Sequence, residues 1–367
     1  MSEEQELPVI GQDMRTFYEK WREKEGLDVI EGMFIQDMKT VPLKPWKRKG
    51  GNGVFVNLEG AGEENSAYIC EIPAGGTLLP QQHMFEESIF ILEGRGATTV
   101  WNEGGEKQSF EWEPNSLFAI PLNAWHQHFN TRGDKPARYV AVTLAIPMLN
   151  LFYSEDFVFN NPFQFKDRFA GNESYFSGDG KLFQQFDSRM KVWETNFVPN
   201  VLRRDLVGWK ERGGGGRSMM FQLAESCMPA HISTFDVGAY KKGHRHGPGA
   251  HVIIVGGEGY SLLWKDGEPK VRYDWQPGSL VVPPDMCWHQ HFNLGSEPAS
   301  YIALHGKYSP KYRTSKGASY YGIDRDVKSG GHQIEYQDED PLVWEMFDKE
   351  LAKRGIKNQM LPKIGRI

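Results

Sequence analysis

The sequence predicts an all-β protein made of two tandem copies of one β-rich unit, with a few peripheral helices. After Gly26 the apolar residues occur in short runs broken by Gly, Pro and Asn, a texture typical of many short strands. The chain also matches itself at a fixed offset, as between Trp46 and Trp209, which are 163 residues apart. Helical periodicity is confined to two stretches near the ends of the chain. A fixed-period match of this length indicates a duplicated unit.

The self-similarity is carried by segments that keep their tryptophans, glycines and histidines at the same offset. It places the two units at residues 33–147 and 196–310. The matching pairs are WKRKGGNG (46–53) with WKERGGGG (209–216), ILEGRGATTVW (91–101) with IVGGEGYSLLW (254–264), and AWHQHFN (124–130) with CWHQHFN (287–293).

Two terminal segments are expected to contribute the peripheral helices. Residues 1–32 form an N-terminal arm in which an amphipathic pattern runs from Gln12 to Gly26. Residues 311–367 form a C-terminal extension with apolar residues on one face of a helix from Pro341 to Gly355. Glycine favours the end of a helix at both sites.

A connector, residues 148–195, joins the two units. Its content of Phe, Tyr and Trp is too high for a flexible linker. We expect the connector to pack across the two units or against another subunit, and we expect the protein to form a homo-oligomer.

Composition restricts the class of protein. Of the 367 residues, 39% are hydrophobic and 25% are charged, as in ordinary globular proteins. A net charge of −6 without a basic tract argues against nucleic acid as a partner. No apolar run approaches the ~18 residues of a membrane span, and the acidic N-terminus lacks an apolar signal region. The three cysteines show no CxxC spacing. We therefore expect a cytoplasmic protein without a membrane partner.

The residues that most strongly suggest chemistry lie between Gly238 and Asn293, in the second unit. His244 and His246 are separated by one residue, and such side chains point to the same face of a β-strand. His289 lies on a later predicted strand. Three imidazoles on one face are typical ligands of a divalent metal ion. The alternative is that these histidines only satisfy hydrogen bonds inside the unit.

The spacing around His244 and His246 resembles the first motif of the cupin superfamily. That motif is Gly, five residues, His-x-His, three or four residues, Glu, six residues and Gly. Gly238 and the two histidines match it, whereas Ala250 stands at the position of the glutamate.

The second cupin motif is Gly, five residues, Pro-x-Gly, two residues, His, three residues and Asn. Gly278, Pro284, His289 and Asn293 match it, with Met286 at the position of the second glycine. The resemblance covers both units, about 200 residues. It implies that each unit is a small double-stranded β-helix or jelly-roll barrel.

The His-Arg-His of the first motif, the alanine at the glutamate position and the string WHQHFN are similar to the gentisate, salicylate and 1-hydroxy-2-naphthoate dioxygenases. Those enzymes are ring-cleaving bicupins that hold Fe(II) with three histidines. The resemblance implies Fe(II) at His244, His246 and His289, with O2 and an anionic hydroxylated or carboxylated aromatic substrate. Gln290 replaces the aspartate of that family, and the intact set lies here in the second unit rather than the first. The identity of the substrate is therefore not carried over.

The first unit keeps an altered set of ligand residues. Gln81 stands where the second unit has its first histidine, whereas His83, Glu87 and His126 remain. These four residues form a possible second metal site, because a Gln carbonyl is a weak ligand for a hard or borderline ion. The alternative is a barrel that has lost its metal and serves packing and dimerisation.

A further histidine follows each metal-motif histidine by two residues. Strand alternation places His291 on the same face as His289, and His128 corresponds to it in the first unit. His291 is therefore a candidate catalytic base or hydrogen-bond partner beside the metal. A purely structural role is the alternative.

Three functions remain open from the sequence. The preferred hypothesis is an Fe(II)-dependent dioxygenase that cleaves an aromatic ring with O2. One alternative is a bicupin that uses Mn(II) or another divalent ion without O2, as a decarboxylase, isomerase or aminohydrolase. The other is a non-catalytic bicupin that binds a small molecule.

Overall fold

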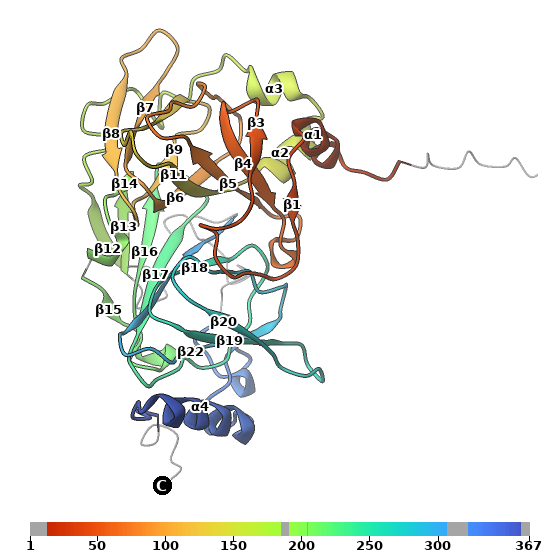
Figure 1. Ribbon diagram of the computed structural model, residues 1–367, viewed down its shortest axis with the longest axis vertical. Helices are drawn as coiled ribbons and strands as arrows, with labels where there is room; N and C mark the ends of the chain where they lie inside the picture. The colour runs from red at the N-terminus through yellow and green to blue at the C-terminus, as the bar shows by residue number, and fades with distance from the viewer. Residues whose placement is uncertain (1–12, 185–190, 204, 307–321, 361–367) are drawn as a thin grey trace, which may run out of the picture.

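In the computed structural model each of the two units consists of one large β-sheet that faces a three-stranded sheet. The structure describes residues 13–184, 191–203, 205–306 and 322–360. In Figure 1 the first unit, coloured red to yellow, lies above the second unit, coloured green to blue. The prediction of an all-β protein with two tandem barrels and a few peripheral helices is confirmed.

The first unit follows the sheet orders β1-β4-β5-β11-β6-β9-β14, with β3 paired to β4, and β10-β7-β8. The pairing is antiparallel except between β1 and β4. The strands are β1 (Val29–Ile30), β3 (Lys44–Trp46), β4 (Gly51–Val56), β5 (Ser66–Ile72), β6 (Glu87–Glu93), β7 (Gly96–Trp101), β8 (Gln108–Trp112), β9 (Leu117–Ile120), β10 (Trp125–Asn130), β11 (Ala137–Thr143) and β14 (Phe197–Val198).

The second unit repeats this plan with the orders β12-β13-β16-β17-β23-β18-β21-β2, with β15 paired to β16, and β20-β19-β22. The strands are β2 (Phe34–Ile35), β12 (Lys181–Gln184), β13 (Lys191–Thr195), β15 (Val207–Gly208), β16 (Arg217–Leu223), β17 (Ala230–Phe235), β18 (His251–Gly256), β19 (Gly259–Trp264), β20 (Val271–Trp275), β21 (Leu280–Val281), β22 (Trp288–Asn293) and β23 (Ala299–Leu304).

The two units exchange their first strands. β2 lies at the start of the first repeat but pairs with β21 of the second unit, in the register Phe34 to Val281. β14 lies at the equivalent position of the second repeat and pairs with β9 of the first unit, in the register Phe197 to Phe118. Each repeat therefore contributes one strand to the sheet of the other barrel. The repeats in the sequence and the barrels in the structure differ by this one strand.

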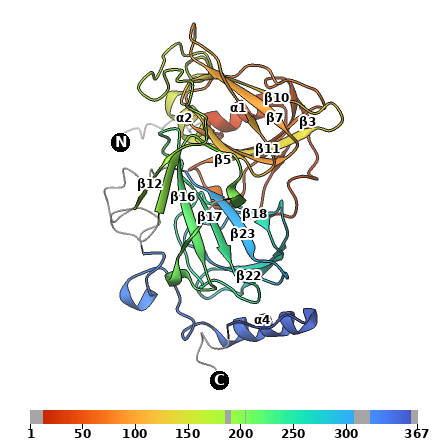
Figure 2. The ribbon, with the colours of Figure 1, turned by 90° about the vertical axis from the view of Figure 1, so that its left-hand side faces the viewer.

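The two units share one hydrophobic core. A single cluster of buried apolar side chains runs from the first unit into the second and includes Ile69, Val140, Phe221 and Ile302, all fully buried. Figure 2 shows β16, β17, β18 and β23 below β5 and β11 in this region. Burial of apolar area on this scale stabilises one particular arrangement of the two barrels.

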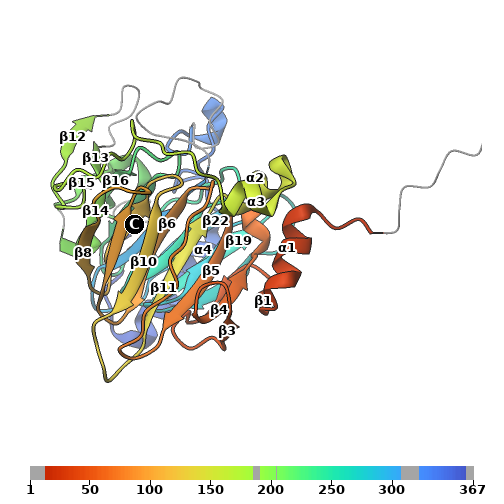
Figure 3. The ribbon, with the colours of Figure 1, turned by 90° about the horizontal axis from the view of Figure 1, so that it is seen from above.

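Helices cover the two ends of the molecule. α1 (Phe17–Glu25) begins later than expected, because Thr16 and Glu19 form a capping box there, and it ends at Gly26. α4 (Pro341–Arg354) begins after Asp340 and ends at Gly355, as the sequence predicts. The connector contributes two helices that the sequence did not predict, α2 (Ala145–Phe152) and α3 (Glu155–Phe159). Figure 3 shows α1, α2 and α3 gathered beside β1, β3 and β4. None of the described helices is long and apolar enough to cross a membrane.

One glycine in each copy is required by close packing against the facing strand. A Cβ on Gly259 would lie 1.9 Å from the carbonyl oxygen of Phe292, and one on Gly96 would lie 2.1 Å from that of Phe129. We expect Gly259→Ala to lower the free energy of unfolding by about 2–3 kcal/mol, because the strand pair must separate to admit the methyl group. Urea denaturation measures the change. Gly208→Ala is the control, since its Cβ meets nothing within 4 Å, and an equal loss in both variants would contradict the packing argument.

Candidate metal centres

The three predicted histidines of the second barrel come together in its interior. His289 lies on β22, whereas His244 and His246 lie on an extended segment between β17 and β18 rather than on a regular strand. His244 and His289 form an isolated antiparallel bridge, and their ring centres are 4.0 Å apart. The ring of His246 lies 4.7 Å from that of His289. One nitrogen from each residue lies within 4.8 Å of the others, so the three histidines form a buried group of suitable geometry for a metal ion.

Backbone carbonyls orient two of these rings for metal binding. Nδ1 of His246 donates to the carbonyl of Gly247 at 2.7 Å, and Nδ1 of His289 donates to the carbonyl of Cys287 at 3.0 Å. A carbonyl only accepts, so in the neutral rings Nε2 carries the lone pair and is the atom that can bind a metal. Burial lowers the pKa of His246 to about 4 and holds that of His289 well below its usual value. Both rings are therefore neutral at neutral pH.

His244 has a different environment. Nη2 of Arg212 donates to its Nδ1 at 2.6 Å, so the neutral ring carries its proton on Nε2. Arg212 is buried and also donates to Gln333 Oε1 at 2.7 Å and to the carbonyl of Ile323 at 3.1 Å. Ligation through Nε2 of His244 therefore requires either that Arg212 moves away or that the ring loses its remaining proton. His246 and His289 fit a metal as they stand, and His244 fits it after this change.

The predicted set of the first barrel also converges. Glu87 Oε2 lies 3.2 Å from His83 Nε2 and 3.7 Å from His126 Nε2. Nδ1 of His83 donates to the carbonyl of Phe85 at 2.8 Å, so its Nε2 lone pair faces a carboxylate oxygen. Nε2 of His126 is buried without a hydrogen-bond partner. Two acceptors face each other here beside an unpartnered nitrogen, which is the arrangement that a cation stabilises. These residues fit a divalent metal ion.

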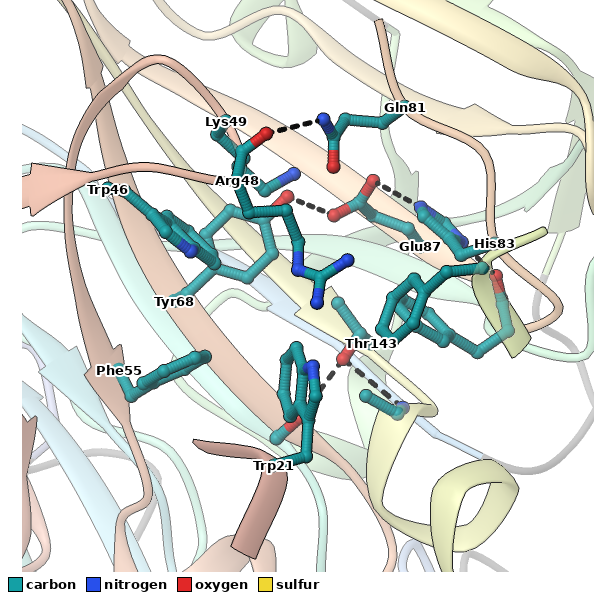
Figure 4. A pocket seen from close by; sticks show the side chains of 14 residues that line it. Trp21, Trp46, Arg48, Lys49, Phe55, Tyr68, Gln81, His83, Glu87 and Thr143 are labelled. Carbon is teal, nitrogen blue, oxygen red and sulfur yellow. Dashed lines mark hydrogen bonds and ion pairs between the residues drawn. The ribbon is translucent and has the colours of Figure 1, made fainter. Parts of the chain in front are cut away.

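Gln81 occupies in the first barrel the place that His244 occupies in the second. It forms the same isolated bridge, here with His126. Its Nε2 donates to the carbonyls of Arg48 at 2.9 Å and Pro80 at 3.0 Å, which leaves the amide oxygen as the ligand atom. Figure 4 shows Gln81 beside Glu87 and His83. Gln81 therefore lies next to the group formed by His83, Glu87 and His126.

A narrow pocket lies beside the first centre (Figure 4). Arg48 lies across it, with its guanidinium 4.2 Å from the ring of Phe159 and its Nε 2.7 Å from Glu25. Aromatic rings and polar side chains both line the pocket, and Thr143 lies near Trp21, away from Glu87. The lining consists of Trp21, Trp46, Arg48, Lys49, Phe55, Ser66, Tyr68, Gln81, His83, Phe85, Glu87, Thr143, Ala145 and Phe159. The helices that supply Trp21 and Phe159 lie outside the repeat, so no sequence motif indicated them.

Glu87 is held as a carboxylate. Burial alone would raise its pKa, but the positive charge of Lys49 is the largest of the effects that hold the pKa well below its usual value. Lys49 is itself buried beside the ring of Tyr68, 4.6 Å away. It corresponds to Arg212 of the second copy. That correspondence is the one sequence signal that could have identified both cations as part of the sites.

His291 lies in the second barrel as strand alternation predicts, with its ring 5.8 Å from that of His289. The Ser261 hydroxyl accepts from Trp275 Nε1 at 3.1 Å and lies 2.7 Å from His291 Nδ1. The Ser261 hydroxyl therefore donates its proton to Nδ1 of His291, and the neutral imidazole carries its own proton on Nε2. Burial lowers the pKa of His291 to about 3. In this state His291 is a hydrogen-bond donor, and its catalytic role stays a prediction.

The same relay exists in the first barrel. Thr98 Oγ1 accepts from Trp112 Nε1 at 3.0 Å and lies 2.8 Å from His128 Nδ1. Burial lowers the pKa of His128 to about 3. Because both copies hold this histidine in the same way, the relay supports the barrel interior in either unit.

Two adjacent lysines of the second barrel, Lys241 and Lys242, have different surroundings. Lys241 is buried, and its ammonium contacts Ser233 Oγ and, at 3.3 Å, the hydroxyl of Tyr301. Lys242, the next residue, instead pairs with Glu335 at 2.5 Å. Lys241 therefore faces the interior with the histidines, whereas Lys242 does not.

Comparison with known proteins agrees with this architecture. Residues 68–143 match the family model described as a cupin domain. An auxin-binding protein of Nicotiana tabacum is 26% identical over 136 residues, which cover 35% of this chain and 72% of that protein. A mutant of Bacillus subtilis oxalate decarboxylase is 14% identical, with a TM-score of 0.50 over 76% of this chain and 78% of that one. A structure of the same enzyme from work on its Mn(II) centers gives the same values.

At 14% identity the two decarboxylase structures establish the fold and nothing finer. The matched cupin domain contains His83, Glu87 and His126 of the first centre. The second unit repeats the same strands and places its histidines at the equivalent positions. The chain therefore has the two-barrel bicupin fold, and its residues 68–143 match the cupin domain.

Proposed function

We propose that this bicupin is a metal-dependent enzyme that acts on a small anionic substrate at the three-histidine centre of the second barrel. The observation that carries the proposal is the buried group of His244, His246 and His289, with Arg212 and Lys241 beside it. Three neutral imidazoles leave the charge of a divalent ion undiminished and leave coordination positions open. Two buried cations favour an anionic group at those positions.

The reaction class that has most support is a decarboxylation or related step without O2. The similar folds include oxalate decarboxylases, one of them studied for its Mn(II) centers. A bound divalent ion would act as a Lewis acid on the substrate. Arg212 would orient a carboxylate, and the Tyr301 hydroxyl would supply a proton. Both Lys241 and Arg212 lower the pKa of Tyr301 against the effect of burial, which suits a proton donor.

An Fe(II)-dependent dioxygenase is the second candidate. It is favoured by the absence of a carboxylate from the three-histidine group, with Ala250 at the position of Glu87, as in the ring-cleaving dioxygenases that the sequence resembles. An anionic aromatic substrate and O2 would share the open face of the ion.

Anaerobic reconstitution with either Mn(II) or Fe(II) distinguishes the candidates. We expect CO2 release without O2 uptake when the Mn(II) protein is offered a panel of small di- and keto-carboxylates. O2 uptake by the Fe(II) protein with hydroxybenzoates would instead establish the dioxygenase. Failure to bind either metal would overturn both and leave a non-catalytic binding protein.

A further inference from the structure

The two barrels differ in the charge of their interiors at corresponding positions. Both copies keep a buried cation, Lys49 in the first and Arg212 in the second. The carboxylate of Glu87 in the first copy is replaced by Ala250 in the second. The second copy has in addition gained Lys241, where the first copy has a leucine. One cation and one carboxylate have thus become two cations, and the three-histidine group contains no carboxylate.

Lys241 is a buried ammonium whose contacts are all neutral. Its side chain contacts Ser233 Oγ and the hydroxyl of Tyr301, and it lies over the rings of Tyr301 at 4.9 Å and Phe235 at 5.6 Å. No carboxylate of the described residues is within ion-pair distance of it. A buried charge without a counter-charge costs several kcal/mol in a folded protein, by order of magnitude. A negatively charged ligand would supply the missing counter-charge.

Arg212 is in a similar position. Its three hydrogen bonds go to neutral acceptors, namely His244, Gln333 and the carbonyl of Ile323. The charges of Asp324 and Glu335 act on Arg212, but neither carboxylate forms an ion pair with it in the described part of the chain. Glu335 is already paired with a lysine at 2.5 Å. Residues 307–321, which the structure does not describe, contain neither Asp nor Glu.

The two cations lie in the same part of the barrel interior, where the charge of Arg212 acts on Lys241 and both cations act on Tyr301. Arg212 contacts His244 directly on one side. On the other side Lys241 contacts Tyr301, and the Tyr301 ring lies 5.2 Å from that of His291. Arg212 therefore lies at His244 itself, and Lys241 lies on the far side of Tyr301, which neighbours His291.

We propose that the second barrel binds a small dianion, such as a short dicarboxylate, with one anionic group at Arg212 and the other at Lys241. The proposal deepens the proposed function, on which it rests for the location of the reacting group. A monoanion would leave one buried cation without a counter-charge, so the site selects against it. Selection against monoanions by the second barrel would separate its ligands from any that bind in the aromatic pocket of the first.

Isothermal titration of the full chain with malonate and with monomethyl malonate tests the charge requirement. The two probes share a skeleton and differ by one charge. We expect malonate to bind at least ~10-fold more tightly, a difference of about 1.4 kcal/mol, both in Mn(II)-loaded and in metal-free protein. Equal binding of the two probes would overturn the proposal.

Lys241→Met separates a ligand-binding role from a structural one. We expect the variant to lose the preference for malonate, while its Tm without ligand stays the same or rises because a buried charge has been removed. A fall in Tm with the malonate preference intact would show that Lys241 only supports the fold, and would overturn the proposal. Lys242→Met is the matched control and should keep the preference, because its ammonium pairs with Glu335.

The titrations also separate this proposal from the proposed function. The malonate preference of metal-free protein depends only on the two cations, so its loss tests the dianion site and not the metal centre. Mn(II) binding that is unaffected by His246→Ala would instead refute the metal centre, and the malonate preference of metal-free protein would still decide the dianion site.

Discussion

His246→Ala will weaken metal binding by the second barrel at least ~100-fold, because loss of an outer-shell partner alone costs 10–100-fold and a ligand contributes more. His246 is buried, is oriented by the carbonyl of Gly247 and lies 4.7 Å from His289 in ring-centre distance. Turnover should fall below detection, since the proposed chemistry takes place at this ion. Metal analysis after anaerobic purification and titration with Mn(II) both measure the effect.

The duplication provides a matched control for this variant. His83 of the first barrel corresponds to His246, has the same Nδ1 contact to a carbonyl and is equally buried. His83→Ala should remove metal from the first barrel and leave the metal and turnover of the second in place. The reverse result, with turnover lost only in His83→Ala, would place the chemistry in the first barrel.

Glu87→Gln is expected to destabilise the metal-free protein by about 1–3 kcal/mol, because the buried cation Lys49 loses the nearby negative charge that acts on it. The pKa of Glu87 is held well below its usual 4.5. Its contribution to stability is therefore complete above that usual value and is lost as the pH falls toward the depressed pKa. Urea denaturation of EDTA-treated protein at neutral and acidic pH should show the difference from wild type shrinking on acidification.

A double variant and a surface variant are the controls for Glu87. Glu87→Gln combined with Lys49→Met removes both charges and should recover most of the lost stability. Glu111, which is exposed on β8, should tolerate the same change without effect. If the double variant is no more stable than Glu87→Gln, the loss does not come from the charge of Lys49.

Much of the site was predictable because its ligands recur at a fixed spacing. The offset between the copies, and the positions of His244, His246 and His289 within it, are properties of the sequence. The positions of Gln81 and His126 followed by correspondence, and the structure brings each of these sets together. Capping residues similarly located the C-terminal helix, since Asp340 and Gly355 act through local hydrogen bonds.

The positions of the two buried cations, Arg212 and Lys241, were not predictable in this way. Arg212 meets His244, 32 residues away, because the loop that carries it folds over the interior of the barrel. Lys241 and Lys242 are adjacent and chemically alike, yet one is buried beside Tyr301 and the other pairs with Glu335. Only the path of the chain decides which of two neighbouring lysines faces the interior.

The sequence by itself determined that the chain is duplicated, that its units are β-rich and that each carries a set of candidate metal ligands, because periodicity and spacing are local properties. The tertiary structure decided the exchange of β2 and β14 between the barrels, since strand pairing over long separations depends on the packing of both sheets. It also decided the tautomers of the metal-facing histidines, which are set by carbonyls and by Arg212. The electrostatic difference between the two barrels depends on the sequence and on the fold. The substitutions are visible in the sequence, but only the fold shows that they lie in the interior.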